Sequence, residues 1–338
     1  MKFELRIHIT TDSETSVKWA GSAYYTNIHF DSVKITNGLI SISGHRSSRF
    51  DLKRILYNSA STLYYQIVKV LAFYYLCSGY PLLIDKMELS SDIFQTETET
   101  DFLQPFKKNL CPYQVMSENE LENLFSFQGE KQLFLTCIIC YINAIQDNSF
   151  ENYWKSFNSL YSILKHEGTE FDKLKTVRSF VESHSNRFAN TLAHINLDTS
   201  ADIRKLRIRE FILNDWPTIS HTKAFADTVQ RFSDIRIIRV FEETLPYRID
   251  FLRNQGLDTS VQNYITTCKK QNKTDNVELL CFYILKYSYF IRNKYFHAEK
   301  ANPYFILKKT AEIEEMHRIS EVFSCFLADF IRCNELYL

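Results

Sequence analysis

The chain has 338 residues, a length that usually corresponds to about two domains. Its 40 basic and 40 acidic residues give a formal net charge of zero, which argues against a protein that coats nucleic acid through a basic surface but leaves open a local site for one phosphate. With 45% hydrophobic residues and only 7 Gly and 6 Pro, the chain can bury a large core in long regular elements, mostly helices.

The N-terminus and the cysteines indicate a soluble, cytoplasmic protein. The segment MKFELRIHITTD lacks the uninterrupted apolar stretch of a signal peptide, and no run reaches the roughly 18 to 20 apolar residues of a membrane span. Eight cysteines lie mostly in apolar runs. The CIIC pair, Cys137 and Cys140, has no second pair and no nearby His, so we expect buried free thiols and neither a metal nor a cofactor.

Short alternating segments predict a strand-rich N-terminal domain over residues 1–115. The expected strands are rich in Ile, Tyr and Thr and are separated by polar turns, at residues 2–9, 22–30, 32–35 and 39–44. Apolar residues at helical spacing then predict a helix from Phe50 to Gly79, and a strand that returns to the sheet follows over residues 81–94. Polar residues and Pro mark the boundary near residue 115.

The remainder, residues 116–338, is expected to be almost entirely helical. Ser117 and Glu120 have the spacing of a capping box at the start of this domain. Two consecutive helices, a more charged insertion over about 170–270, a very apolar helix and a long final helix follow. The basic clusters Arg204–Arg209 and Arg231–Arg239 have acidic neighbours and are expected to be solvated helix faces. The sequence therefore predicts an α+β protein with a small sheet and a helical bundle.

Arg292, Asn293 and His297 come at the end of the most apolar predicted helix. A near-neutral His can take a proton from a ribose 2′-OH or give one to a leaving oxygen, and a guanidinium can hold the phosphate. On an ideal helix Arg292 and His297 are about 140° apart, so they meet at one ligand only if the Arg curls back or a second copy packs alongside. Alternatively, Arg292 pairs with Glu299 and His297 caps the helix.

The segment RNKYFH resembles the R-x4-6-H motif of the HEPN superfamily (higher eukaryotes and prokaryotes nucleotide-binding domains), at the place where that family has it, before a long final helix. A second segment, FENYWKSFNSLYSIL, is similar to a helix of many HEPN proteins through five residues: Phe150, Trp154, Asn158, Leu160 and Tyr161. Core packing is the alternative reading of Trp154, Asn158 and Tyr161. The two matches cover about 118–166 and 273–335.

This resemblance implies an up-and-down bundle that forms a homodimer with the two motifs facing each other. It also implies a metal-independent ribonuclease, acting on RNA as a toxin or an anti-phage defence effector, with an antitoxin or defence protein as a further partner. By position, Arg292 would stabilise the phosphate, His297 would act as acid and base, and Asn293 would orient either. Supporting or substrate-binding roles fall to Lys294, Glu299 and Asn158. A HEPN scaffold that binds a nucleotide, RNA or protein without catalysis is the alternative.

Overall fold

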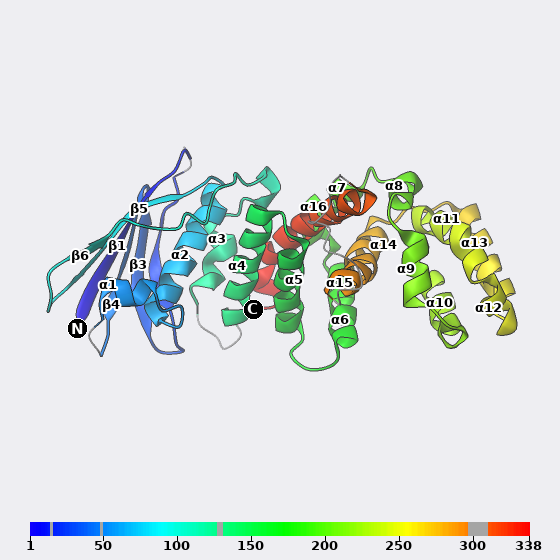
Figure 1. Cartoon of the computed structure of the whole chain (residues 1–338), viewed down its shortest axis with the longest axis horizontal. Helices are drawn as coiled ribbons and strands as arrows, with labels where there is room; N and C mark the ends of the chain where they lie inside the picture. The colour runs from blue at the N-terminus through cyan, green and yellow to red at the C-terminus, as the bar shows by residue number, and fades with distance from the viewer. Residues whose placement is uncertain (14–15, 48–49, 127–130, 297–309) are drawn as a thin grey trace. The chain divides into compact units, whose positions relative to one another are not determined.

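The computed structural model describes residues 1–338 except 14–15, 48–49, 127–130 and 297–309. The described chain forms two compact units. The first consists of Met1–Lys173 and Leu327–Leu338, and the second of Leu174–Phe326. Figure 1 traces their elements in chain order from the N-terminal sheet to the last helix.

The first unit contains an antiparallel sheet. Its strand order among the described residues is β2-β3-β4-β1-β5-β6. Buried and accessible residues alternate along the central strand β1, and its Leu5 and Ile7 are fully buried, so one face of the sheet carries the core. The bounds are β1 (Lys2–Thr10), β2 (Trp19–Tyr24), β3 (Phe30–Thr36), β4 (Leu39–His45), β5 (Leu83–Ser91) and β6 (Glu97–Glu99).

The strand predicted over residues 22–30 is wrong in its extent, because a turn divides it into the end of β2 and the start of β3. In this turn the backbone N–H groups of Tyr25 and Thr26 donate to the His29 carbonyl at 3.0 and 3.3 Å. The Thr26 hydroxyl oxygen accepts a further bond from the His29 N–H at 2.9 Å. These local bonds close a hairpin within an otherwise strand-like run. The strand β6 was not predicted.

Two helices follow the sheet where one was predicted. The chain turns between α1 (Leu52–Leu56) and α2 (Thr62–Ser78), with the Ser61 N–H donating to the Asn58 carbonyl at 2.9 Å. The helix α2, buried along most of its length, lies alongside the sheet in Figure 1. It ends at Gly79, as predicted, whose φ of 76° is in the left-handed region that favours glycine. A Cβ at Gly79 would lie 2.7 Å from Cγ2 of Val115.

After the last strand and the loop that follows it, the regular elements of the first unit are helices. The Ser117 hydroxyl accepts from the Glu120 N–H while the Glu120 carboxylate accepts from the Ser117 N–H, so the predicted capping box is confirmed. The helices α4 (Lys131–Asp147) and α5 (Phe150–Leu164) pack side by side and confirm the consecutive pair predicted from the sequence. The elements are η1 (Pro112–Gln114), α3 (Glu118–Leu121), η2 (Glu122–Leu124), α4 (Lys131–Asp147), α5 (Phe150–Leu164) and, at the C-terminus, η7 (Asn334–Leu336).

The second unit consists of helices in its described part. The segment expected to be an insertion contributes α6 (Glu170–Ser183, which begins in the first unit), η3 (Ser185–Phe188), α7 (Ala189–Ile195), α8 (Ser200–Arg204), α9 (Ile208–Asp215), η4 (Ile219–His221), α10 (Thr222–Val229), α11 (Ile235–Thr244), η5 (Leu245–Tyr247), α12 (Ile249–Asn254) and α13 (Asp258–Gln271). It then continues through α14 (Asn276–Cys281), the π-helix η6 (Phe282–Tyr287), α15 (Ser288–Phe296) and α16 (Ala311–Arg332), which ends in the first unit.

The α+β class with a mainly helical C-terminal part is confirmed. The compact units divide the chain after Lys173 and after Phe326. The division predicted at residue 115 and the insertion at 170–270 stay predictions, as does the HEPN-type bundle.

Candidate functional site

The predicted motif lies at the end of a helical segment that changes its winding. Asp275 caps the N-terminus of α14, and its carboxylate accepts from the backbone N–H groups of Val277 and Glu278 at 3.1 Å each. The next turn, η6, is a π-helix, a rare conformation often found at functional sites. Phe282 and Tyr287 within it are buried, so the motif at the end of α15 emerges from the core.

Arg292 and Asn293 interact with each other on one side of α15. Nη1 of Arg292 donates to Oδ1 of Asn293 at 2.8 Å. The guanidinium carbon of Arg292 lies 5.7 Å from the centre of the Tyr289 ring, one turn earlier. All three residues are half-buried. The amide and the ring therefore orient a guanidinium that solvent still reaches, an arrangement suited to holding a phosphate.

Lys294 lies on the other side of α15. It is only 8% exposed, and its ammonium donates to Oδ1 of Asn214, at the end of α9, at 2.6 Å. Phe290, one turn before Lys294, packs edge-on against Phe211 of α9 at 5.5 Å between ring centres. Side chains two positions apart on an α-helix point about 200° apart around its axis, so Lys294 and Arg292 point to opposite sides. The structure does not bring these two predicted cations together, and substrate binding by Lys294 stays a prediction.

Asp215 is a titratable residue next to Lys294 that the sequence analysis missed. Burial raises the pKa of its carboxyl from 3.8 to about 6, while Lys286 and Lys294 act in the opposite direction. Burial in turn lowers the pKa of Lys286, with the positive charge of Arg231 acting in the same direction. A carboxyl that titrates near neutrality is typical of acid–base chemistry but also of buried ion pairs. The signal in the sequence was weak, because Asp215 is 71 positions from Lys286 and only the fold brings them together.

The remaining predicted site residues are His297, Glu299 and Asn158. His297 and Glu299 lie outside the described residues, so their roles stay predictions. Asn158 belongs to the first unit and is exposed on α5, whereas Trp154 and Tyr161 of the same helix are 2% and 3% exposed. The core-packing interpretation of Trp154 and Tyr161 is therefore supported, and that of Asn158 is not.

A second polar cluster in the second unit consists of His194, Asp198, Tyr283 and Arg318. Arg318 donates through Nη2 to Oδ1 of Asp198 at 2.5 Å, and the Tyr283 hydroxyl donates to Oδ2 at 2.8 Å. Nη1 of Arg318 lies 3.0 Å from Nε2 of His194, which must accept. Burial, and next Arg318, lower the pKa of His194, which favours the neutral ring that this bond requires. The four side chains are linked by hydrogen bonds, so the cluster connects α7, η6 and α16.

The basic clusters also take part in internal ion pairs. The side chain of Glu315 is fully buried and accepts from Nε of Arg207 at 2.7 Å and from the Tyr287 hydroxyl. Arg236 is 6% exposed and donates to Asp234 at 2.6 Å. The expected solvated face is therefore wrong for Arg207 and Arg236, because each has a buried carboxylate as partner.

The cysteines and acidic residues do not form a metal site in the part of the chain that the structure describes. Cys137 is buried, and burial raises the pKa of its thiol to about 12. Cys140 is half-buried and Cys111 exposed, and the other cysteines are buried. None of the helices in the described chain could span a membrane.

Comparisons with protein-family models, with curated proteins and with solved structures find no match to this chain. The resemblance to the HEPN superfamily rests on the two sequence segments alone, and the bundle and the activity that it implies stay predictions.

Proposed function

We propose that this chain is a metal-independent RNA endonuclease of the HEPN type, working as a homodimer in the cytoplasm as a toxin or an anti-phage defence effector. The observation that carries the proposal is the pair formed by Arg292 and Asn293. The guanidinium is oriented by an amide at 2.8 Å and by the ring of Tyr289, and His297 follows one residue after the end of α15.

In the proposed reaction, the ribose 2′-oxygen attacks the neighbouring phosphorus and loses its proton to a base. The P–O5′ bond breaks, and the leaving 5′-oxygen takes a proton from an acid. The products are a 2′,3′-cyclic phosphate and a 5′-hydroxyl. His297 of the two protomers would supply the base and the acid. Arg292 would stabilise the negative charge that develops on the phosphate oxygens. DNA lacks the 2′-hydroxyl and would not be cleaved.

The half-exposed side of α15 is the surface on which the partner protomer would pack. Arg292, Asn293 and Tyr289 lie on it, whereas Phe290 and Lys294 pack inward against α9. Two copies of this side would bring two guanidinium groups to one phosphodiester. This arrangement would also overcome the angle of about 140° between Arg292 and His297 on a single helix.

The alternative, a scaffold that binds a partner without catalysis, is favoured by the ion pairs of the basic clusters. Arg204 pairs with Glu243 at 2.5 Å, and Arg207 and Arg236 have buried carboxylate partners. Guanidinium groups held in this way contribute little to an extended RNA-binding surface. A small catalytic site does not need such a surface, so weak RNA binding alone does not exclude the enzyme. Only an assay of RNA cleavage distinguishes the enzyme from the scaffold.

The test is an RNA cleavage assay in EDTA with the parent chain and the variants His297→Ala and Arg292→Ala. We expect products ending in 2′,3′-cyclic phosphate from the parent. Loss of the acid–base group should lower the rate about 10²- to 10⁴-fold, and loss of the guanidinium about 10²- to 10³-fold. His221→Ala and Arg253→Ala, which remove exposed side chains of the second unit, serve as matched controls and should cleave like the parent.

Equal cleavage by the folded variants and the parent would refute the enzyme proposal. If neither the parent nor the variants cleave RNA, the scaffold becomes the preferred function. In that case RNA binding is measured against salt concentration, and a steep loss of affinity identifies a dedicated RNA binder.

A further inference from the structure

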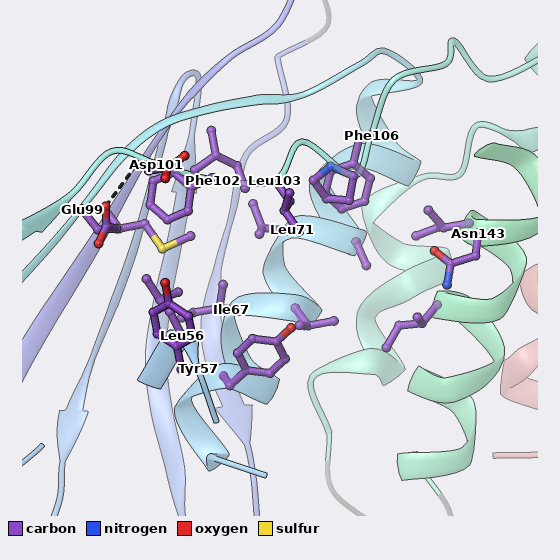
Figure 2. Close-up of a pocket in the computed structure, with 18 residues that line it drawn as sticks. Leu56, Tyr57, Ile67, Leu71, Glu99, Asp101, Phe102, Leu103, Phe106 and Asn143 are labelled. Atoms are coloured by element: carbon purple, nitrogen blue, oxygen red, sulfur yellow. Dashed lines mark hydrogen bonds between the residues drawn. The ribbon is translucent and has the colours of Figure 1, made fainter. Parts of the chain in front are cut away.

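The first unit contains an apolar pocket that the proposed nuclease activity does not use. Its volume is about 580 Å³, within the range typical of small-molecule sites. Three parts of the unit form it: α1 and α2, the strands β5 and β6 with the loop that follows, and α4 (Figure 2). The pocket therefore joins the strand-rich residues 1–115 to the first long helix of the helical part.

Most of the pocket wall is apolar. Ile67 and Leu71 of α2 lie in its middle, and Phe106 lies towards α4 (Figure 2). At the rim, Tyr57 and Leu103 are 83% and 94% exposed, although both are large apolar side chains. An apolar ligand in the pocket would remove these surfaces from water, which is the main source of affinity for such a site.

The two charged residues that line the pocket are both acidic. Glu99 and Asp101 lie at one end, and Asn143 lies at the other (Figure 2). No Lys, Arg or His belongs to the lining among the described residues. Oε1 of Glu99 accepts from the backbone N–H groups of Thr100 and Asp101 at 3.0 and 3.1 Å. These bonds hold the carboxylate in place and lower its pKa, and Lys53 of α1, which is not part of the lining, acts on this pKa in the same direction. The carboxylate therefore carries its negative charge at neutral pH.

We propose that this pocket binds an elongated apolar small molecule with a positively charged group at the end near Glu99 and Asp101. The two carboxylates would attract an ammonium group, and they would repel the head group of a fatty acid or a phosphate. The apolar chain would extend between α2 and β5 towards α4. The proposal is independent of the nuclease function, because none of the pocket residues belongs to the motif.

The probes are dodecylamine, hexylamine and dodecanoate, each below the concentration at which it forms micelles, titrated calorimetrically into the full-length chain at pH 7. We expect one dodecylamine to bind per chain, with about tenfold or greater preference over dodecanoate. Hexylamine should bind at least about 100-fold more weakly than dodecylamine, since each buried methylene contributes about a threefold to fourfold change in affinity.

Two variants place a Trp in the pocket from opposite walls. Val68→Trp on α2 and Ile139→Trp on α4 start from half-buried residues, so at least one of them should fold, as judged by circular dichroism. Each should abolish dodecylamine binding. Tyr65→Trp changes an exposed residue of α2 outside the pocket and should bind dodecylamine like the parent.

The charge argument is tested by the double variant Glu99→Gln and Asp101→Asn, which keeps the size of both side chains. It should lose the preference for dodecylamine over dodecanoate. The proposal would be overturned if the parent did not bind dodecylamine or if a folded Trp variant still bound it. It would also be overturned if the double variant kept the preference for dodecylamine over dodecanoate.

Discussion

Replacing Asp215 by Asn should stabilise the second unit at neutral pH and not at acidic pH. Burial raises the pKa of Asp215 from 3.8 to about 6, so the folded state binds this proton more tightly than the unfolded state does. Below the ordinary pKa the carboxyl is protonated in both states and burial has no cost. Above about 6 it is charged in both states, and the folded state carries the full cost of burying the charge.

The difference between 3.8 and about 6 corresponds to about 3 kcal/mol, at about 1.36 kcal/mol per pKa unit. Water still reaches this half-buried side chain, so we expect a smaller effect, about 2 kcal/mol. The advantage of Asp215→Asn in the free energy of unfolding should grow by this amount between about pH 4 and pH 7 and then level off.

The assay is urea unfolding monitored by the fluorescence of Trp216. This residue directly follows Asp215 and is 5% exposed, so its fluorescence reports on unfolding around Asp215. Trp19 and Trp154 are replaced by Phe in all proteins compared, because the chain has 3 Trp and these two report on the first unit. Asp227→Asn, at an exposed position on α10, controls for the loss of one negative charge. A stability difference between Asp215→Asn and its parent that stays constant from pH 4 to pH 7 would refute the reasoning.

Three further substitutions test the contacts that define the two units, each by its effect on the free energy of unfolding. Gly79→Ala should cost more than about 2 kcal/mol, because the added Cβ combines a positive φ with a close contact to Val115. Gly256→Ala, which has a positive φ but open space around it, should cost about 1 kcal/mol, and equal costs would contradict the contact with Val115. Arg207→Met should cost about 3 to 5 kcal/mol, because it leaves the buried carboxylate of Glu315 without its cationic partner. Arg204→Met, which breaks an exposed ion pair, should cost less than about 1 kcal/mol, and similar values for the two variants would disprove the difference in burial. Ser288→Ala should cost about 1 kcal/mol, because its hydroxyl donates to the Tyr283 carbonyl at 2.7 Å, and no measurable loss would exclude a contribution from this bond.

Elements defined by local signals were predictable from the sequence. The alternation in β1, the glycine at the end of α2 and the capping box at Ser117 each depend on residues within one element, and each is confirmed. The α4–α5 pair follows from its apolar spacing in the same way. The turn that splits residues 22–30 was missed because Tyr and Thr favour strands, whereas the hydrogen bond that the Thr26 hydroxyl oxygen accepts from the His29 N–H stabilises the turn.

Contacts between distant residues were not predictable. Arg318 and Asp198 are 120 positions apart, and Arg207 and Glu315 are 108 apart. Charge patterning in a single sequence relates neighbours, so it assigned the basic cluster around Arg207 to solvent. Only the fold reveals which of these guanidinium groups meets a buried carboxylate.

The orientation of the candidate site depends on the π-helical turn, which apolar periodicity did not reveal. An ideal α-helix has 3.6 residues per turn, and the wider winding of η6 changes the direction in which every later side chain points. After this turn, Phe290 and Lys294 pack against α9, and Arg292 lies about 200° around the helix from Lys294. The side of α15 that carries Arg292 is thus determined by packing around Phe282 and Tyr287, whose buried rings hold the segment in place. A substitution that restores α-helical winding in η6 would change the direction in which Arg292 points without replacing any residue of the motif. The effect of the orientation of Arg292 on the proposed site could then be told apart from the effect of losing a motif residue.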